Sequence, residues 1–219
     1  MYKNFLLLPQ KKGSWYYISF IDDHTHYYWF YLIKHYFEFF KIYTVFRALV
    51  KTQHSAVIKC FRCDLSGEYN SNKFYALFVL NRTIHQTLCT NTLEQNGIAK
   101  RKYKHIVENV CSFLLFIFVP NMFWDEVVLT AIGLINTISS SYTLCFSPFE
   151  KLYGYTLDYF FFRVFSYTYF ILLPHIECNK LSSRSNIYIF LGYGEGKKRY
   201  HYFNPITWKL YVSQYYKET

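Results

Sequence analysis

The chain has 219 residues, in which 24 Lys and Arg outnumber 14 Asp and Glu and give a net charge of +10. With 52% hydrophobic residues and only 8 Gly and 5 Pro, the composition excludes disordered, collagen-like and low-complexity chains. The longest apolar runs, residues 110–119 and 159–173, are too short or too interrupted to cross a bilayer, which needs about 20 consecutive apolar residues. We expect no membrane span and no export signal, and the positive charge favours an anionic partner such as nucleic acid.

The first part of the sequence predicts alternating strands and helices. Two β-rich runs within residues 15–33 flank the polar segment 22–26, which is the pattern of a β-hairpin. Apolar side chains at helical spacing follow over 36–53, and 57–63 is typical of a strand. Further on, the pattern predicts a helix over 71–80, a strand over 83–86, and helices over 98–118 and 123–139. This order predicts an α/β sheet covered by helices.

The residue pattern of the sequence changes near residue 155. Short aromatic strands are expected over 163–172, 185–193, 199–203 and 209–213, with turn residues between them. Such closely spaced strands predict a small β-barrel or sheet domain. The boundary between the two parts should lie near residues 147–158.

The cysteine and histidine residues are possible metal ligands. The 6 cysteines are too few for a disulfide scaffold, so buried reduced thiols are expected. Cys60 and Cys63 have a zinc-like spacing, but the sequence offers no second Cys or His pair at a finger-like distance. We expect His24, His26 and His85 to form local hydrogen bonds instead of binding metal.

A series of motifs carries a family resemblance. In chain order they are residues 17–25 (Tyr-Ile-Ser-Phe-Ile-Asp-Asp-His-Thr), Asp64 with Gly67-Glu68-Tyr69, His85-Gln86, Gln95-Asn96-Gly97, Phe123-Trp124, Ser147-Pro148-Phe149-Glu150, Phe190-Leu191-Gly192-Tyr193 and Tyr211-Val212-Ser213. The earlier motifs resemble the integrase core of copia-type retrotransposon polyproteins. The later ones resemble the retroviral polymerase SH3-like domain that follows such cores.

The resemblance implies an architecture and an ancestral activity. It implies an RNase H-like α/β integrase core over residues 1–145, lacking its first strand, followed by a small all-β SH3-like barrel over residues 146–219. Members of the family join element DNA to target DNA by phosphoryl transfer, with Mg²⁺ or Mn²⁺ held by two Asp and one Glu. The resemblance further implies DNA as partner, a possible homo-oligomer, and a nuclear location if the chain is expressed.

The three carboxylates of the family can be compared with this chain one at a time. Asp64 matches the middle Asp, at the end of a predicted strand. Lys100 stands where the family has Glu, so the charge is reversed. The first Asp would fall at or just before Met1, and the resemblance places Asp22 and Asp23 at the far end of the next strand. Asp64 is therefore expected to be the only surviving catalytic carboxylate and a weak metal ligand, and we predict no strand transfer.

Polar and basic residues gather around the start of the long predicted helix. They are Gln95, Asn96, Lys100, Arg101, Lys102 and Lys104. The resemblance implies that this helix faces DNA, although a solvated helix face would carry the same charges. Residues 197–199, Lys-Lys-Arg beside aromatic side chains, are more typical of a charged hairpin tip than of a base-stacking site. Two alternatives stay open: a domesticated, non-catalytic DNA-binding or interaction module, and an unfolded relic without function.

Overall fold

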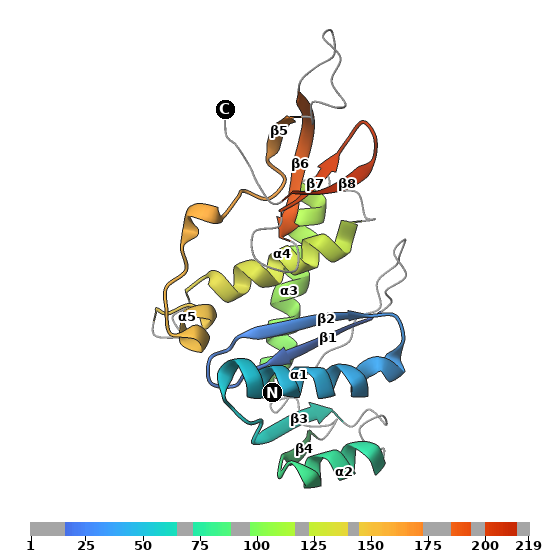
Figure 1. Ribbon diagram of the computed structural model, residues 1–219, viewed down its shortest axis with the longest axis vertical. Helices are drawn as coiled ribbons and strands as arrows, with labels where there is room; N and C mark the ends of the chain where they lie inside the picture. The colour runs from blue at the N-terminus through green and yellow to red at the C-terminus, as the bar shows by residue number, and fades with distance from the viewer. Residues whose placement is uncertain are drawn as a thin grey trace. The chain divides into compact units, whose positions relative to one another are not determined.

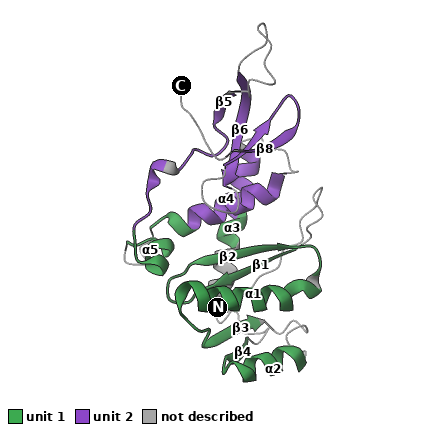
Figure 2. Ribbon diagram, in the orientation of Figure 1, with its two compact units in different colours: residues 1–107, 136–155 green, residues 108–135, 156–219 purple. Residues whose placement is uncertain are grey.

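The computed structural model describes residues 16–64, 72–88, 97–116, 123–139, 145–172, 185–193 and 200–213 (Figure 1). The chain divides into two compact units (Figure 2). Unit 1 comprises residues 1–107 and 136–155, and unit 2 comprises residues 108–135 and 156–219. Over the described ranges, no helix combines the length and the hydrophobicity needed to traverse a bilayer.

Unit 1 begins with an antiparallel hairpin of β1 (Tyr16–Ile21) and β2 (Tyr28–Ile33), as the sequence predicts. Its turn is held by Asp22, whose Oδ2 accepts hydrogen bonds from the backbone N–H of Thr25 at 2.9 Å and from the Thr25 hydroxyl at 2.8 Å. Aspartate stabilises turns in this way because its short side chain reaches the backbone two or three residues ahead. The polar segment between the strands is therefore a structured turn.

A helix and a parallel strand pair follow the hairpin. A short 3₁₀ helix, Tyr36–Glu38, leads into α1 (Phe39–His54). β3 (Cys60–Asp64) then pairs in parallel with β4 (Ile84–Leu88), and α2 (Asn72–Leu80) lies between them in the chain. Parallel strands need such a crossover connection. The predicted strand over 57–63 is shorter in the structure, because residues 57–59 have no regular structure and Val57 is 69% exposed.

An aromatic core joins the hairpin, α1, α2 and β3. Phe20 stacks on Phe46 with ring centroids 4.3 Å apart, and Tyr43 packs edge-on against Phe61 at 4.9 Å. The buried members of this core are Ile18, Phe20, Ile33, Phe39, Tyr43, Phe46, Phe61, Cys63, Phe74 and Phe78. Because Phe61 and Cys63 belong to it, β3 is anchored up to the residue before Asp64.

The remaining helices are α3 (Gly97–Phe116), α4 (Trp124–Thr137) and α5 (Pro148–Tyr153). α5 was not predicted from the sequence. Its ends are well defined: Ser147 and Glu150 form a reciprocal capping box, and Gly154 closes the helix with a φ of 77°. A helix this short depends on its caps for stability. It also has too few turns to show an apolar period in the sequence.

Unit 2 contains a four-stranded antiparallel sheet in the order β5-β6-β7-β8. The strands are β5 (Thr168–Leu172), β6 (Ser185–Tyr193), β7 (Tyr200–Asn204) and β8 (Lys209–Ser213), preceded by the 3₁₀ helix Tyr159–Phe161. β5 starts later than the sequence predicts because Ser166, with a φ of 61°, interrupts the extended chain. One buried cluster consists of Tyr169, Tyr188, Phe190, Tyr200 and Tyr202.

The four cysteines in the described ranges are reduced thiols, and Cys89 and Cys178 lie outside those ranges. Cys63 is buried, but the prediction of burial is wrong for Cys111 and Cys145, which are exposed. Cys111 lies on the outer side of α3, and Cys145 lies in a turn with a φ of 66°. Neither position provides the apolar surroundings in which cysteine is usually buried.

Candidate functional site

Asp64 is the last residue of β3 and stands opposite Leu88, the last residue of β4. The prediction that Asp64 ends a strand is confirmed for the backbone, and its side chain lies outside what the structure describes. The carboxyl ends of neighbouring parallel strands meet at one edge of a sheet, which is where α/β proteins place their sites. The fold therefore brings the backbone of Asp64 to such an edge.

A cysteine and a histidine link the two strands directly before this edge. The Sγ of Cys63 lies 3.1 Å from Nε2 of His85, and the imidazole of His85 stacks on Phe78 with ring centroids 4.8 Å apart. Desolvation lowers the pKa of His85 below its ordinary value, which favours the neutral ring. His85 thus has a hydrogen-bonding contact with the neighbouring strand β3.

The two acidic residues after β1 are engaged by neighbouring groups. Asp22 closes the hairpin turn, and Asp23 Oδ2 forms an ion pair with Nη1 of Arg62 at 2.9 Å. The same guanidinium donates through Nε to Oε1 of Gln86 at 2.7 Å. Arg62 thus connects the hairpin turn, β3 and β4, and both carboxylates have local structural roles.

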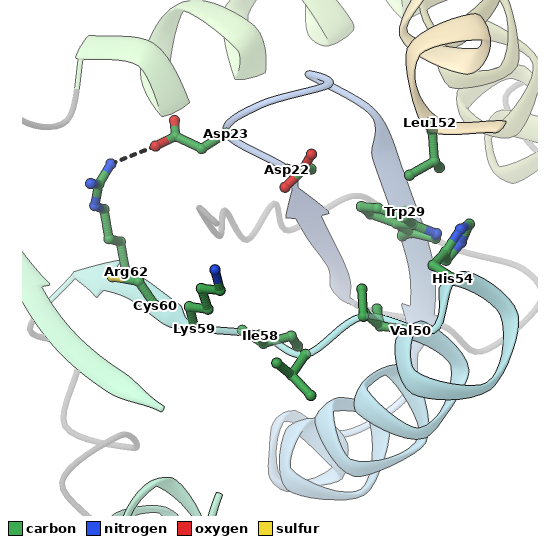
Figure 3. A pocket seen from close by; sticks show the side chains of 12 residues that line it. Asp22, Asp23, Trp29, Val50, His54, Ile58, Lys59, Cys60, Arg62 and Leu152 are labelled. Carbon is green, nitrogen blue, oxygen red and sulfur yellow. Dashed lines mark hydrogen bonds and ion pairs between the residues drawn. The ribbon is translucent and has the colours of Figure 1, made fainter. Parts of the chain in front are cut away.

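A pocket of about 310 Å³ opens beside this ion pair (Figure 3). It is lined by Asp22, Asp23, Trp29, Val50, His54, Ala56, Val57, Ile58, Lys59, Cys60, Arg62 and Leu152. Figure 3 shows its residues coming from the hairpin, the end of α1, the start of β3 and α5. Sequence reasoning missed it because the hairpin residues, the link from α1 to β3 and Leu152 of α5 meet only after folding. None of the residues predicted to be catalytic or to bind DNA lines this pocket.

The predicted DNA-binding residues are only partly described. Lys100, Arg101 and Lys102 lie in the first turns of α3, and their side chains lie outside the described part. Lys104 on the same helix is exposed to solvent. Gln95 and Asn96 precede α3 and lie outside the described residues altogether. The DNA-binding assignment therefore stays a prediction for all of them.

Within the ranges that the structure describes, no three His, Cys, Asp or Glu side chains gather to hold an ion. Cys60 and Cys63 also differ in burial, the first being half-buried and the second 1% exposed.

Comparison with known proteins identifies the chain's relatives. A model of the retroviral polymerase SH3-like domain matches residues 167–217. The retrovirus-related Pol polyprotein from transposon TNT 1-94 of Nicotiana tabacum is 32% identical over 203 residues, which is 92% of this chain and 15% of that protein. The chain is a homologue of copia-type retrotransposon Pol polyproteins. The corresponding polyprotein from transposon RE1 of Arabidopsis thaliana is 30% identical over 200 residues, 91% of this chain and 14% of that protein. This chain therefore spans only about 15% of the length of the first of these relatives.

Solved structures of viral integrases share the fold of this chain. A chain in the cryo-EM structure of the simian T-cell lymphotropic virus intasome in complex with PP2A regulatory subunit B56 gamma matches with a TM-score of 0.55 and 12% identity, covering 100% of this chain and 78% of that one. The HTLV-2 integrase catalytic core domain in complex with magnesium matches with a TM-score of 0.50 and 13% identity, covering 69% of this chain and 94% of that one. This chain therefore has an integrase-like α/β fold followed by an SH3-like sheet.

Proposed function

We propose that this chain is an integrase-like module that binds DNA without catalysing strand transfer. The feature that supports the proposal is Lys100 on α3, which the family resemblance places where integrases have Glu. Transfer by two metal ions needs carboxylates that bind both ions and offset their charge. Asp64 alone cannot do this, and a lysine ammonium supplies no oxygen ligand.

The donor set argues against a catalytic metal. One viral neighbour is an integrase core in complex with magnesium. Mg²⁺ and Mn²⁺ prefer several oxygen ligands, and a lysine at one family position supplies a cation in place of an oxygen anion. The residues that this chain offers, Asp64 and Lys100, do not fit such a site, so we assign it no metal-dependent step.

Charge supports binding to DNA. The chain has a net charge of +10, and the first turns of α3 contain Lys100, Arg101, Lys102 and Lys104. Lysine and arginine bind DNA phosphates with release of counterions, so such binding weakens as salt rises. Assembly into homo-oligomers is part of the proposal, because the HTLV-2 integrase core has been solved in trimeric and dimeric forms.

A second candidate function is a protein-interaction module that has lost DNA binding. Exposed aromatic residues in unit 2 favour it: Tyr159 is 57%, Phe160 75%, Tyr167 60% and Phe170 61% exposed. Large exposed aromatic side chains are typical of surfaces that bind partners. This function predicts no salt-dependent association with duplex DNA.

The test is a titration of the chain with duplex DNA at low and high salt, using a matched pair of charge reversals. Lys104→Glu changes an exposed residue of α3, and Lys51→Glu makes the same charge change on an exposed residue of α1. We expect Lys104→Glu to weaken binding and to reduce the salt slope by about 1, and Lys51→Glu to leave the slope unchanged. Equal effects of both variants would show that only net charge matters, and no binding by the parent chain would overturn the proposal.

A further inference from the structure

Within unit 2, two buried polar side chains of α4 have hydrogen-bonding partners on the sheet. Glu126 is 5% exposed and Thr130 4% exposed. Oε2 of Glu126 lies 2.6 Å from Nδ1 of His201 on β7, and the hydroxyl of Thr130 donates to the carbonyl of Leu191 on β6 at 3.2 Å. Burying a polar group is costly unless it has a partner. The sheet thus makes it possible for this side of α4 to be buried.

The backbone of β6 approaches α4 closely at Gly192. A Cβ atom added there would lie 2.2 Å from Oγ1 of Thr130, and Gly192 has a φ of +137° that other residues rarely adopt. The register of β6 against β7 shifts between Phe190 and Gly192, so a β-bulge lies at this point. Such bulges re-aim a strand locally. Glycine is needed here both for its backbone conformation and for the space that it leaves.

Apolar side chains also contribute to the contact between the α4 segment and the sheet. The rings of Phe123, directly before α4, and Phe203 on β7 have centroids 4.7 Å apart. Val127 and Leu191 are fully buried, at 0% exposure. The face of the sheet that carries His201 and Phe203 is therefore packed, and it is distinct from the tyrosine-rich cluster of Tyr169, Tyr188 and Tyr202.

We infer that the C-terminal sheet carries a helix-docking face, formed by Gly192, His201 and Phe203, and that its occupant is α4 of the same chain. The SH3-like family match covers residues 167–217 and so leaves out this helix. The sheet and α4 form one cooperative folding unit although 30 residues separate the end of α4 from the start of β5. This inference does not depend on the proposed DNA binding.

Amide hydrogen exchange on the full-length chain tests the inference through two glycine substitutions. Gly192→Ala places a methyl group against Thr130, whereas Gly133→Ala changes α4 itself at a position where a Cβ atom meets nothing within 4 Å. We expect Gly192→Ala to reduce protection of β6, β7 and the Trp124–Ile135 part of α4 together, and Gly133→Ala to preserve it. Loss of protection in the sheet alone, or in neither element, would overturn the inference.

A double-mutant cycle gives a second test that tolerates destabilisation. Glu126→Leu and His201→Leu each remove one partner of the 2.6 Å contact, and the double variant removes both. If the helix docks on the sheet, the unfolding equilibrium constant of the double variant changes by a smaller factor than the product of the two single changes. A factor equal to that product would show that the two side chains do not interact and would contradict the docking face.

Discussion

Asn136 holds the backbone of Tyr28 at two points. Its Oδ1 accepts a hydrogen bond from the Tyr28 N–H, and its Nδ2 donates to the Tyr28 carbonyl, each at 2.9 Å. Asn136 is 5% exposed and Tyr28 2% exposed, so water does not readily replace either bond. The end of α4 is thereby fixed to the first residue of β2 within unit 1.

Asn136→Ala should lower the free energy of unfolding markedly. The substitution removes both partners of a buried peptide N–H and carbonyl, which costs about 1–3 kcal/mol for each group left without a partner. Urea denaturation of the parent and the variant measures the difference. Thr52→Ala is the control, since its exposed hydroxyl bonds only within α1, and its effect should stay within about 0.5 kcal/mol. Equal effects of the two substitutions would contradict the role of Asn136.

Stability should fall as the pH drops below 6.5, in part because of His85. Desolvation lowers the pKa of His85 in the folded state from its ordinary value of 6.5. The unfolded chain therefore takes up the proton more readily, so this contribution is complete above pH 6.5 and is lost as the pH falls toward the folded pKa. Urea midpoints measured at about pH 7.5 and about pH 5.5 should differ less for His85→Gln than for the parent chain.

Cys63→Ala serves as the control for this pH effect. It removes the thiol that contacts His85 but leaves the imidazole stacked on Phe78. Because burial is the cause of the lowered pKa, the pH dependence should persist in this variant. Its disappearance in Cys63→Ala would show that the thiol contact, and not burial, controls the titration.

Tyr43→Phe should maintain or raise stability. The Tyr43 hydroxyl is buried without a hydrogen-bond partner in the described part of the chain, and its burial raises its pKa from 10.0 to about 12. Removing a buried unpaired hydroxyl eliminates a desolvation cost of about 1–3 kcal/mol. Tyr43→Leu, by contrast, should destabilise, because it also removes the ring that packs on Phe61. A loss of stability in Tyr43→Phe as large as in Tyr43→Leu would refute this view of the hydroxyl.

Tyr43→Phe should also change how stability depends on pH in alkaline solution. A folded pKa above that of the unfolded chain means that stability is complete below pH 10.0 and is lost as the pH rises toward 12. Unfolding curves recorded across this range should therefore fall less steeply for Tyr43→Phe than for the parent chain.

Ser147→Ala should destabilise the chain by about 1 kcal/mol through loss of an N-cap. The Ser147 hydroxyl accepts from the N–H of Glu150 at 3.1 Å, and Oε2 of Glu150 accepts from the Ser147 N–H at 2.8 Å. Ser147→Asp, which retains an acceptor at the cap, should recover most of the loss. Chemical denaturation compares the three chains, and equal stability of Ser147→Ala and the parent would rule out a contribution from the cap.

The sequence predicted the elements that have strong local signals. The hairpin of β1 and β2 followed from two β-rich runs around a polar turn, and the predicted bounds of β6 and β8 match the structure. α5 was missed although Ser147, Pro148 and Glu150 carry its cap signal, because a helix this short lacks an apolar period. β5 was predicted too long, because a positive φ at Ser166 leaves no mark in a hydrophobic pattern.

The candidate site was only partly predictable. The placement of Asp64 at a strand end followed from the chain order and is confirmed by β3. The charge reversal at Lys100 comes from the family resemblance and stays a prediction. The contacts of Arg62 with Asp23 and Gln86, and the packing of α4 on Gly192, depend on residues that meet only after folding. Local patterns carry no information about such pairs.

The central claim, DNA binding without catalysis, is tested most directly in one experiment. The purified chain is titrated with duplex DNA at two salt concentrations while Mn²⁺-dependent strand transfer is measured in the same samples, with an integrase that has all three carboxylates as the positive control. We predict binding that weakens as salt increases and no joined product. Joined product above background would contradict the assignment of Asp64 and Lys100, and salt-independent or absent binding would contradict the DNA-binding function.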